Sequence, residues 1–213
     1  MWETLKKAGI EPSPRRTGPT WSQILRSQAE ALLATDFFTA DLLDGTTPYV
    51  MAVIEHSTRR IHILGVTAHL TGAWVTHQAR NLLMDLDSQT EAIRFLVRDR
   101  DTKFTAAFDE VFRAACIRIL KKPGSGTRAN AIAERWIGGC RRELLDRTLI
   151  WNQPHLLHML RVYEAHHNQH RPHHSLGQAA PFRPLPDAAD LAIIRTRRRD
   201  LIGGVIHEYA QVA

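Results

Sequence analysis

Residues 31–67 contain the three apolar runs that decide the fold, ALLATDFFTA (31–40), TPYVMAVIEH (47–56) and RRIHILGVT (59–67). The runs are rich in β-forming residues and short turn-like breaks separate them, so we predict three antiparallel strands joined by hairpins. Residues 72–87, GAWVTHQARNLLMDLD, then place apolar side chains at helical spacing, and IRFLVRD (93–99) returns to a short apolar strand. The predicted order is β-β-β-α-β.

The second half of the chain continues this alternation. Residues 104–115 are amphipathic, with Phe108, Val111 and Phe112 on one face, and CIRILKKP (116–123) is a candidate fifth strand. Asn130 is a favoured helix N-cap, and NAIAERWIGGCRRELLD (130–146) carries an apolar stripe made of Ala133, Trp136, Ile137, Cys140 and Leu144. A further helix is predicted over 154–168. We therefore predict an α/β fold with a mixed five-stranded sheet flanked by helices, in which helical crossovers add the later strands.

The predicted core has a segment on either side of it. Residues 2–8 form a predicted short helix, and the Pro-rich, charged segment EPSPRRTGPT (11–20) follows. Because so short a helix cannot bury its own apolar face, we expect residues 1–20 to be a linker with the remnant of an upstream domain. The core domain is expected over 21–186 and a C-terminal tail over 187–213. In that tail the run RTRRR (195–199) either contacts phosphate or is simply solvated.

The charge of the chain favours a polyanionic partner. Lys and Arg number 28 against 22 Asp and Glu, which gives a formal net charge of +6 and a pI near 9.8. This balance suits nucleic acid, although a basic protein that never meets DNA is the alternative. Charge alone therefore selects nucleic acid as the first partner to test.

Cysteine and hydropathy patterns exclude other classes of protein. Cys116 and Cys140 lie in separate segments without CxxC spacing, so we expect neither a zinc framework nor a disulfide, and interpret both as small core residues. No apolar stretch approaches the roughly 18 residues that span a bilayer, and no signal-peptide h-region follows Met1. We expect no membrane association and a cytoplasmic protein.

Three acidic residues interrupt otherwise apolar elements. Asp36 lies within the first strand, Asp99 at the end of the fourth and Glu134 early in the helix that opens at Asn130. A carboxylate in a buried element is costly unless it is paired or binds metal. Carboxylate oxygens suit Mg²⁺ or Mn²⁺, and two such ions about 4 Å apart can clamp the attacking and leaving oxygens of phosphoryl transfer. Each acid alone could equally be a turn residue or a helix-end charge. The predicted topology places Asp36 and Asp99 on neighbouring strands.

Four motifs in this order resemble one known family. They are ATDFFT (34–39), VRDRDTKF (97–104), RANAIAERWIGGCRRELLDR (128–147) and HHNQHRPHHSLG (166–177). Over about residues 21–186 the chain is similar to the integrase core of bacterial insertion-sequence transposases and retroviral-type integrases. The resemblance implies a ribonuclease H-like fold in which Asp36, Asp99 and Glu134 are the catalytic, metal-binding carboxylates. Asp101 is the rival of Asp99, and Glu143 is a weaker rival of Glu134.

The resemblance also implies an activity, its cofactors and its partners. Family members use Mg²⁺ or Mn²⁺, here expected as two ions, to let water release a 3′-hydroxyl at an element end. That hydroxyl then attacks a target phosphodiester in double-stranded DNA, and the enzymes act as homo-oligomers. An upstream helix-turn-helix region recognises the element ends, and only its possible tail is expected within residues 1–20. Two other functions stay open: a truncated, non-catalytic DNA-binding remnant, and a nuclease of the same fold.

Basic and amide side chains near these motifs are candidate DNA contacts. Gly138 and Arg141 fall on the helical face of Glu134. The proposed phosphate contacts are Arg128 in the loop KKPGSGTR (121–128), Arg141, Arg142, Asn168, Arg171 and His173. A solvated charged helix is the alternative for the arginines of the helix, and polar packing is the alternative for the last three.

The histidine-rich stretch HHNQHRPHH (166–174) raises the question of a zinc site. Histidines at i and i+4 can share a metal, and His166 and His170 have that spacing. Pro172 should break the helix before the last two histidines, and no cysteine partner lies nearby. We therefore disfavour zinc here.

Overall fold

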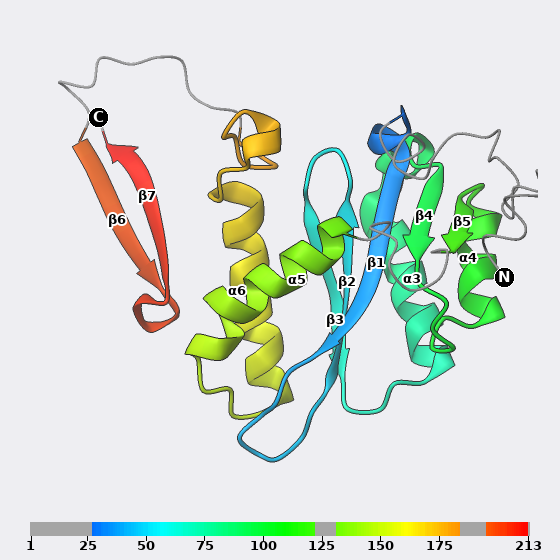
Figure 1. Ribbon diagram of the computed structural model, residues 1–213, viewed down its shortest axis with the longest axis horizontal. Coiled ribbons are helices and arrows are strands. Elements are labelled where there is room, and N and C mark those ends of the chain that lie inside the picture. Colours follow the sequence, from blue (N-terminus) through cyan, green and yellow to red (C-terminus); the bar gives the residue numbers. More distant parts are fainter. Residues whose placement is uncertain (1–26, 122–130, 184–194, 213) are drawn as a thin grey trace, which may run out of the picture.

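The computed structural model describes residues 27–121, 131–183 and 195–212. Within them, five strands form one mixed sheet in the order β3-β2-β1-β4-β5 (Figure 1). The strands β1 (Leu32–Thr39), β2 (Tyr49–Glu55) and β3 (Ile61–Thr67) are antiparallel to one another. The strands β4 (Phe95–Arg98) and β5 (Arg118–Lys121) run parallel to β1 and to each other. The predicted α/β fold with a mixed five-stranded sheet is confirmed.

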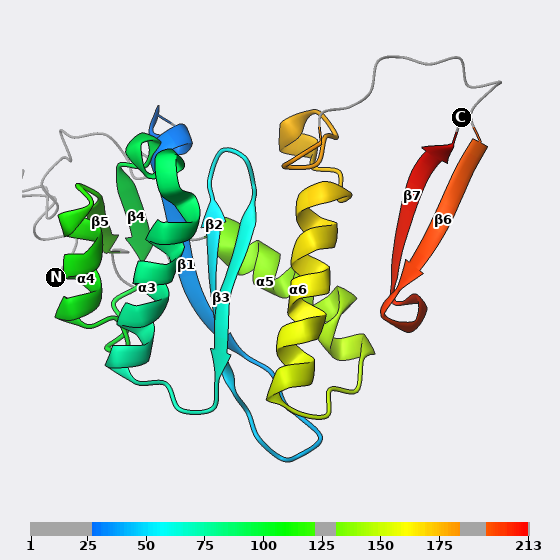
Figure 2. The same ribbon diagram turned by 180° about the vertical axis from the view of Figure 1, so that it is seen from behind.

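Helices cover both faces of this sheet. One face carries α5 (Ala131–Glu143) and α6 (Gln153–Gln169); in Figure 1, α6 lies beside β3 and α5 crosses in front of α6. The other carries α3 (Gly72–Leu86) and α4 (Ala106–Ala114), which lie in front in Figure 2. Short 3-10 turns complete the described chain, at Ala29–Ala31, Asp87–Ala92, Leu145–Arg147, His174–Leu176 and Ile202–Gly204.

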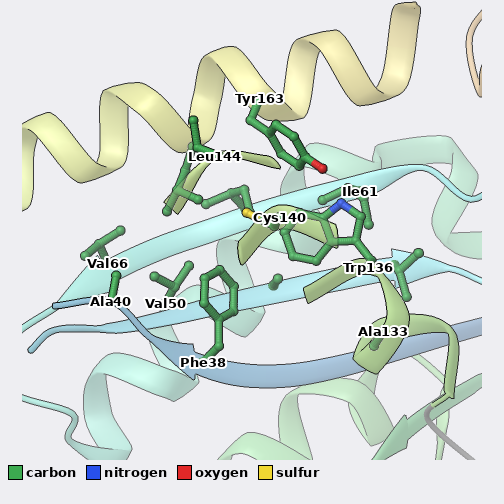
Figure 3. Close-up of a cluster of buried hydrophobic side chains, with 14 of the residues drawn as sticks. Phe38, Ala40, Val50, Ile61, Val66, Ala133, Trp136, Cys140, Leu144 and Tyr163 are labelled. Carbon is green, nitrogen blue, oxygen red and sulfur yellow. The ribbon is translucent and has the colours of Figure 1, made fainter. Parts of the chain in front are cut away.

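The strand sequences create two hydrophobic cores, one on each face of the sheet. Successive side chains of a strand point to opposite faces, so β1 contributes to both cores: Leu32 and Ala34 to one, Leu33 to the other. Figure 3 shows the first core, where Phe38 lies under the helices and its ring centroid is 5.9 Å from that of Trp136. The Trp136 and Tyr163 centroids are 6.3 Å apart, so aromatic contacts join β1, α5 and α6.

Capping side chains set where the helices begin. Thr71 accepts a hydrogen bond from the Trp74 N–H and starts α3, and Thr105 accepts one from the Phe108 N–H and starts α4. The predicted helix over 104–115 therefore begins later than the apolar pattern suggests. Asn130, the predicted N-cap of the next helix, lies outside the described residues.

One of the two cysteine predictions is wrong. Cys140 is fully buried on the core-facing side of α5, as predicted, and burial raises its thiol pKa to about 12. Cys116 is exposed instead. It has a φ of 60° immediately after α4, where the chain turns toward β5. This turn places its side chain outside the core. The fifth strand therefore begins at Arg118 and not at Cys116.

A C-terminal hairpin was not predicted. Strands β6 (Arg195–Leu201) and β7 (Ile206–Val212) pair antiparallel as a separate two-stranded sheet. Ile206 is buried in the first hydrophobic core, and the Glu208 carboxylate lies 3.5 Å from His166 and 3.6 Å from His170 of α6. The hairpin therefore contacts α6. Residues 1–20, predicted as a linker and upstream remnant, lie outside the described residues.

A search of the described helices finds none that is both long enough and apolar enough to cross a membrane.

Candidate functional site

One pocket of about 450 Å³ collects the three predicted carboxylates. Asp36 comes from β1, Asp99 directly follows β4, and Glu134 comes from the first turn of α5. In the parallel pairing of β1 with β4, Ala34 is opposite Val97, and each Asp lies two residues beyond its strand's member of that pair. The expectation that Asp36 and Asp99 lie side by side therefore agrees with the sheet register. The pocket is lined by Asp36, Phe37, Phe38, Thr39, Tyr49, Asp99, Asp101, Lys103, Glu134, Ile137 and Arg141.

Helix α5 presents one face to this pocket. Glu134, Ile137 and Arg141 are spaced i, i+3 and i+7, and all three line it. An Arg141 guanidinium N–H donates to the Thr39 backbone carbonyl at 2.9 Å, which ties α5 to the end of β1. Arg141 thus adds positive charge beside the carboxylates, as its position on the helix predicts. Arg142 is exposed, and one of its guanidinium nitrogens lies 3.2 Å from where a Cβ at Gly138 would stand.

Local hydrogen bonds orient the acidic side chains. Asp36 Oδ1 accepts the Phe37 N–H at 2.9 Å, and Asp99 Oδ1 accepts the Asp101 N–H at 3.0 Å. Asp101 in turn accepts the Lys103 N–H and forms an ion pair with the Lys103 ammonium. Partial burial would raise the pKa of Asp101, but the bonds from Lys103 outweigh it and hold that pKa below its ordinary value. Asp101 is therefore ionised at neutral pH.

The donor set fits a hard divalent cation in its chemistry. Three carboxylates border one open pocket, and carboxylate oxygen is the ligand that Mg²⁺ and Mn²⁺ prefer. Among the described residues, no three His, Cys, Asp or Glu side chains are placed to ligate a single ion. Binding of a cation would therefore require the three side chains to move closer together. The charge of the cation would offset the repulsion between their carboxylates.

The two rival acids differ in their placement. Asp101 lines the carboxylate pocket and remains an alternative to Asp99. Glu143 is bound elsewhere: the Arg171 guanidinium donates to both of its oxygens, and the Tyr163 hydroxyl donates to it at 2.8 Å. These bonds hold the Glu143 pKa below its ordinary value in spite of its partial burial. Glu143 therefore stabilises the packing of α5 on α6.

A buried ion pair between Arg98 and Asp109 lies next to Asp99, and Arg98 also holds the Asp99 backbone. The sequence patterns did not predict this pair. Arg98 is 3% exposed and donates two hydrogen bonds to Asp109 Oδ1 and one to Oδ2, at 2.7–2.9 Å. Its remaining nitrogen donates to the Asp99 backbone carbonyl at 2.8 Å. The available signal was an Arg at the end of an apolar strand and an Asp on the apolar face of the next helix.

The described residues among the other predicted DNA contacts, Asn168, Arg171 and His173, do not line the carboxylate pocket. Arg128 lies outside the described residues. Asn168 is buried, and its amide accepts the Ile61 N–H and donates to the Ile61 carbonyl, both at 2.9 Å. Asn168 therefore fastens α6 to the edge strand β3, which is the polar-packing alternative to a phosphate contact. Arg171 and His173 line a second pocket.

The histidine-rich stretch makes packing contacts. His167 is buried, its Nε2 lies 3.1 Å from the Arg59 carbonyl, and its ring packs edge-on against His173 with centroids 4.6 Å apart. Burial and the neighbouring His173 lower the pKa of His167 to about 3, so its ring is neutral at physiological pH.

Comparisons with known proteins agree with this geometry. Residues 117–181 match the family model described as an integrase core domain. A search of curated protein sequences gives no match. The resemblance found in the sequence is thus confirmed by a family model over α5, α6 and the segments that flank them.

Solved structures share the fold at low sequence identity. The Mos1 transposase catalytic domain, solved with raltegravir and Mg, is 13% identical with a TM-score of 0.54, covering 68% of this chain and 76% of that one. The catalytic core domain of BIV integrase is 15% identical with a TM-score of 0.51, covering 72% and 91%. A chain of the simian T-cell lymphotropic virus intasome in complex with PP2A regulatory subunit B56 gamma is 11% identical with a TM-score of 0.54, covering 86% and 67%. The fold is that of ribonuclease H-like integrase cores.

Proposed function

We propose that this chain is the catalytic core of a DNA transposase or integrase, which cuts DNA with divalent metal and transfers a 3′-hydroxyl to a target phosphodiester. One observation carries the proposal: Asp36, Asp99 and Glu134 come from two neighbouring parallel strands and a covering helix to border one pocket. The likeness of the fold to the Mos1 transposase catalytic domain supports the proposal independently of the residue types.

The three carboxylates are the residues that would hold the metal, Mg²⁺ or Mn²⁺, as two ions. When bound, the ions would supply the positive charge that stabilises the attacking and leaving oxygens of phosphoryl transfer. Asp36 and Asp99 are fixed by the sheet and by their backbone hydrogen bonds, whereas Glu134 is exposed on α5.

Basic side chains around the pocket would hold the DNA backbone. Arg141 lines the pocket, and its bond to the Thr39 carbonyl leaves its other guanidinium N–H groups available for a phosphate oxygen. Arg142 is exposed on the same helix and would contact the next phosphate, and Arg128 is proposed to do the same. The partner is double-stranded DNA. We also propose that the chain acts as a homo-oligomer, since it shares its fold with a chain of an intasome.

The test is an assay for nicking and strand transfer on a labelled DNA duplex, with Mg²⁺ or Mn²⁺, using the chain and its Asp99→Asn variant. The proposal expects metal-dependent products that include joined strands, all of them lost in the variant. Hydrolysis without joined strands would indicate a nuclease of the same fold. DNA binding by a folded chain without any product would indicate a non-catalytic remnant.

A further inference from the structure

A second pocket, of about 310 Å³, lies on the other side of α5 from the carboxylate pocket. Ile132, Arg135, Trp136 and Gly139 line it, whereas the carboxylate pocket takes Glu134, Ile137 and Arg141 from the same helix. At about 100° per residue, these two sets point to opposite faces of α5. The helix therefore separates the pockets. The remaining wall of the second one comes from Ile54, Arg59, His167 of α6 and the segment 171–175.

Positive charge dominates this second pocket. Arg59, Arg135 and Arg171 line it, and no carboxylate does. Glu143 neutralises Arg171 from outside the lining, but within the described residues neither Arg59 nor Arg135 has a carboxylate partner. Burial, together with the charge of Arg135, lowers the pKa of Arg59. Two guanidinium groups are thus held near each other without an anion between them.

The pocket wall also contains buried polar atoms without a partner in the described chain. They are Trp136 Nε1, His167 Nδ1, His173 Nε2 and a terminal nitrogen of Arg59. Of these, His167 Nδ1 is an acceptor, because the other nitrogen of this neutral ring donates to the Arg59 carbonyl. Indole and guanidinium N–H groups can only donate hydrogen bonds, so an acceptor is the missing partner. A buried donor left unpaired costs about 1–3 kcal/mol, and such groups in native proteins usually meet a ligand or an ordered water. Figure 3 shows the Trp136 indole nitrogen on the side of the ring toward Tyr163, away from Phe38.

The shape and the chemistry together select the ligand. Residues that carry hydrogen-bond donors line the pocket from the β2–β3 turn, from α5 and from segment 171–175, which suits an anion with several acceptor oxygens in different directions. Ile54 and Ile132 give the wall an apolar part that can pack against an attached sugar. A carboxylate, which is planar and has two oxygens, would leave more of these donors unpaired than a phosphate.

We propose that this second pocket is a phosphate-binding site that works without metal. Its phosphate belongs either to the backbone of bound DNA, a source that rests on the proposed function, or to a free phosphate compound. A DNA backbone held here would lie across α5 from the carboxylates, within the roughly 10–12 Å width of a helix. The site would then anchor one phosphate while another reaches the carboxylate pocket.

The test is calorimetric titration of the whole chain with inorganic phosphate in EDTA, at constant ionic strength. Arg59→Gln and Arg135→Gln should each weaken phosphate binding about tenfold, as expected for the loss of one charge-assisted hydrogen bond. Arg113→Gln is the matched control, because Arg113 is an exposed arginine on α4, far from the pocket lining, and it should bind like the wild type. Urea unfolding of each variant checks that it is folded. The absence of phosphate binding by the wild type, or equal affinity in all four folded proteins, would overturn the proposal.

Two further experiments identify the source of the phosphate and show whether this proposal can fail or hold independently of the proposed function. A short DNA duplex in EDTA should displace inorganic phosphate if the backbone is the ligand, and should bind more weakly to Arg59→Gln and Arg135→Gln. A duplex that binds without displacing phosphate assigns the pocket to a free phosphate compound. Glu134→Gln should keep the phosphate affinity of the wild type whether or not the chain forms DNA products.

Discussion

At the scale of single residues, the Arg98–Asp109 pair connects stability with the candidate site. Both side chains are about 3–4% exposed, and Arg98 also holds the Asp99 carbonyl. We predict that Asp109→Asn lowers the free energy of unfolding by about 3 kcal/mol, because it leaves a buried guanidinium without its counter-charge. Urea unfolding measures this. Glu110→Gln on the same helix is the control and should change stability by less than about 0.5 kcal/mol, since Glu110 is exposed. Equal effects of the two variants would contradict the argument.

Glu143 gives a residue-scale prediction about pH. Its folded-state pKa lies below the ordinary 4.5, because the bonds from Arg171 and Tyr163 outweigh the effect of burial. A depressed carboxyl pKa contributes stability that is present above the unfolded-state pKa and is lost as the pH falls through the folded-state pKa. Glu143→Gln should therefore cost about 1 kcal/mol at pH 7, a modest value because the ion pair is partly exposed. Urea unfolding from pH 7 to pH 3 should show this difference shrinking below pH 4.5, and a difference that grows on acidification would refute the assignment.

At the scale of elements, Gly139 of α5 and Gly72 of α3 should respond in opposite ways to an added methyl group. A Cβ at Gly139 would meet Glu143 at 3.8 Å and the Tyr163 hydroxyl at 3.9 Å, which are ordinary contacts. We predict that Gly139→Ala raises the free energy of unfolding by about 0.5–1 kcal/mol through helix propensity, and that the added methyl narrows the second pocket. Gly72→Ala should instead destabilise, since its Cβ would lie 2.6 Å from the Thr105 methyl. Thermal and urea unfolding of both variants test this, and a loss of stability in Gly139→Ala would show that this glycine is needed for packing.

The sequence predicts the sheet and its helices well, because the apolar periods of 31–67, 72–87 and 93–99 agree with the observed burial. It does not predict the β6–β7 hairpin. Arg197 and Arg199 on β6 are exposed, so the strand has no apolar face for the alternation of a half-buried strand to reveal. The hairpin contacts the rest of the chain through Ile206, which is buried in the first core, and Glu208, which lies near His166 and His170 of α6, and these contacts are known only once the fold is known.

The sequence also predicts one part of the candidate site and misses another. Three acids at strand, strand and helix positions could be predicted, since carboxylates in apolar elements are conspicuous. Polar packing of Asn168 and Arg171 was one of two alternatives, but their partners Ile61 and Glu143 could not be predicted, because they are distant in sequence and meet them only in the packed structure. The second pocket could not be predicted from the sequence either, because its arginines come from three separate segments: the β2–β3 turn, α5 and 171–175.

At the scale of the whole molecule, the hairpin extends the basic surface beyond the integrase-like core. Arg197, Arg198 and Arg199 border an open pocket with His170 and Arg183. If the hairpin contacts phosphates, the double variant Arg197→Gln/Arg199→Gln should weaken duplex binding and reduce the slope of log affinity against log salt by about 2. Fluorescence anisotropy at several salt concentrations measures the slope. Arg161→Gln, an exposed change on α6, is the control, and an unchanged slope in the double variant would show that the hairpin does not touch the DNA.

The central claim is that Asp36, Asp99 and Glu134 act together on DNA, and matched pairs of variants test it most directly. The measurement is the rate of metal-dependent nicking and strand transfer by Asp99→Asn beside Asp101→Asn, and by Glu134→Gln beside Glu143→Gln, each at equal folded concentration. We expect Asp99→Asn and Glu134→Gln to abolish product in Mg²⁺ and Mn²⁺, and Asp101→Asn and Glu143→Gln to retain it. Full activity in Asp99→Asn or Glu134→Gln, or loss only in the Asp101 and Glu143 variants, would contradict the claim.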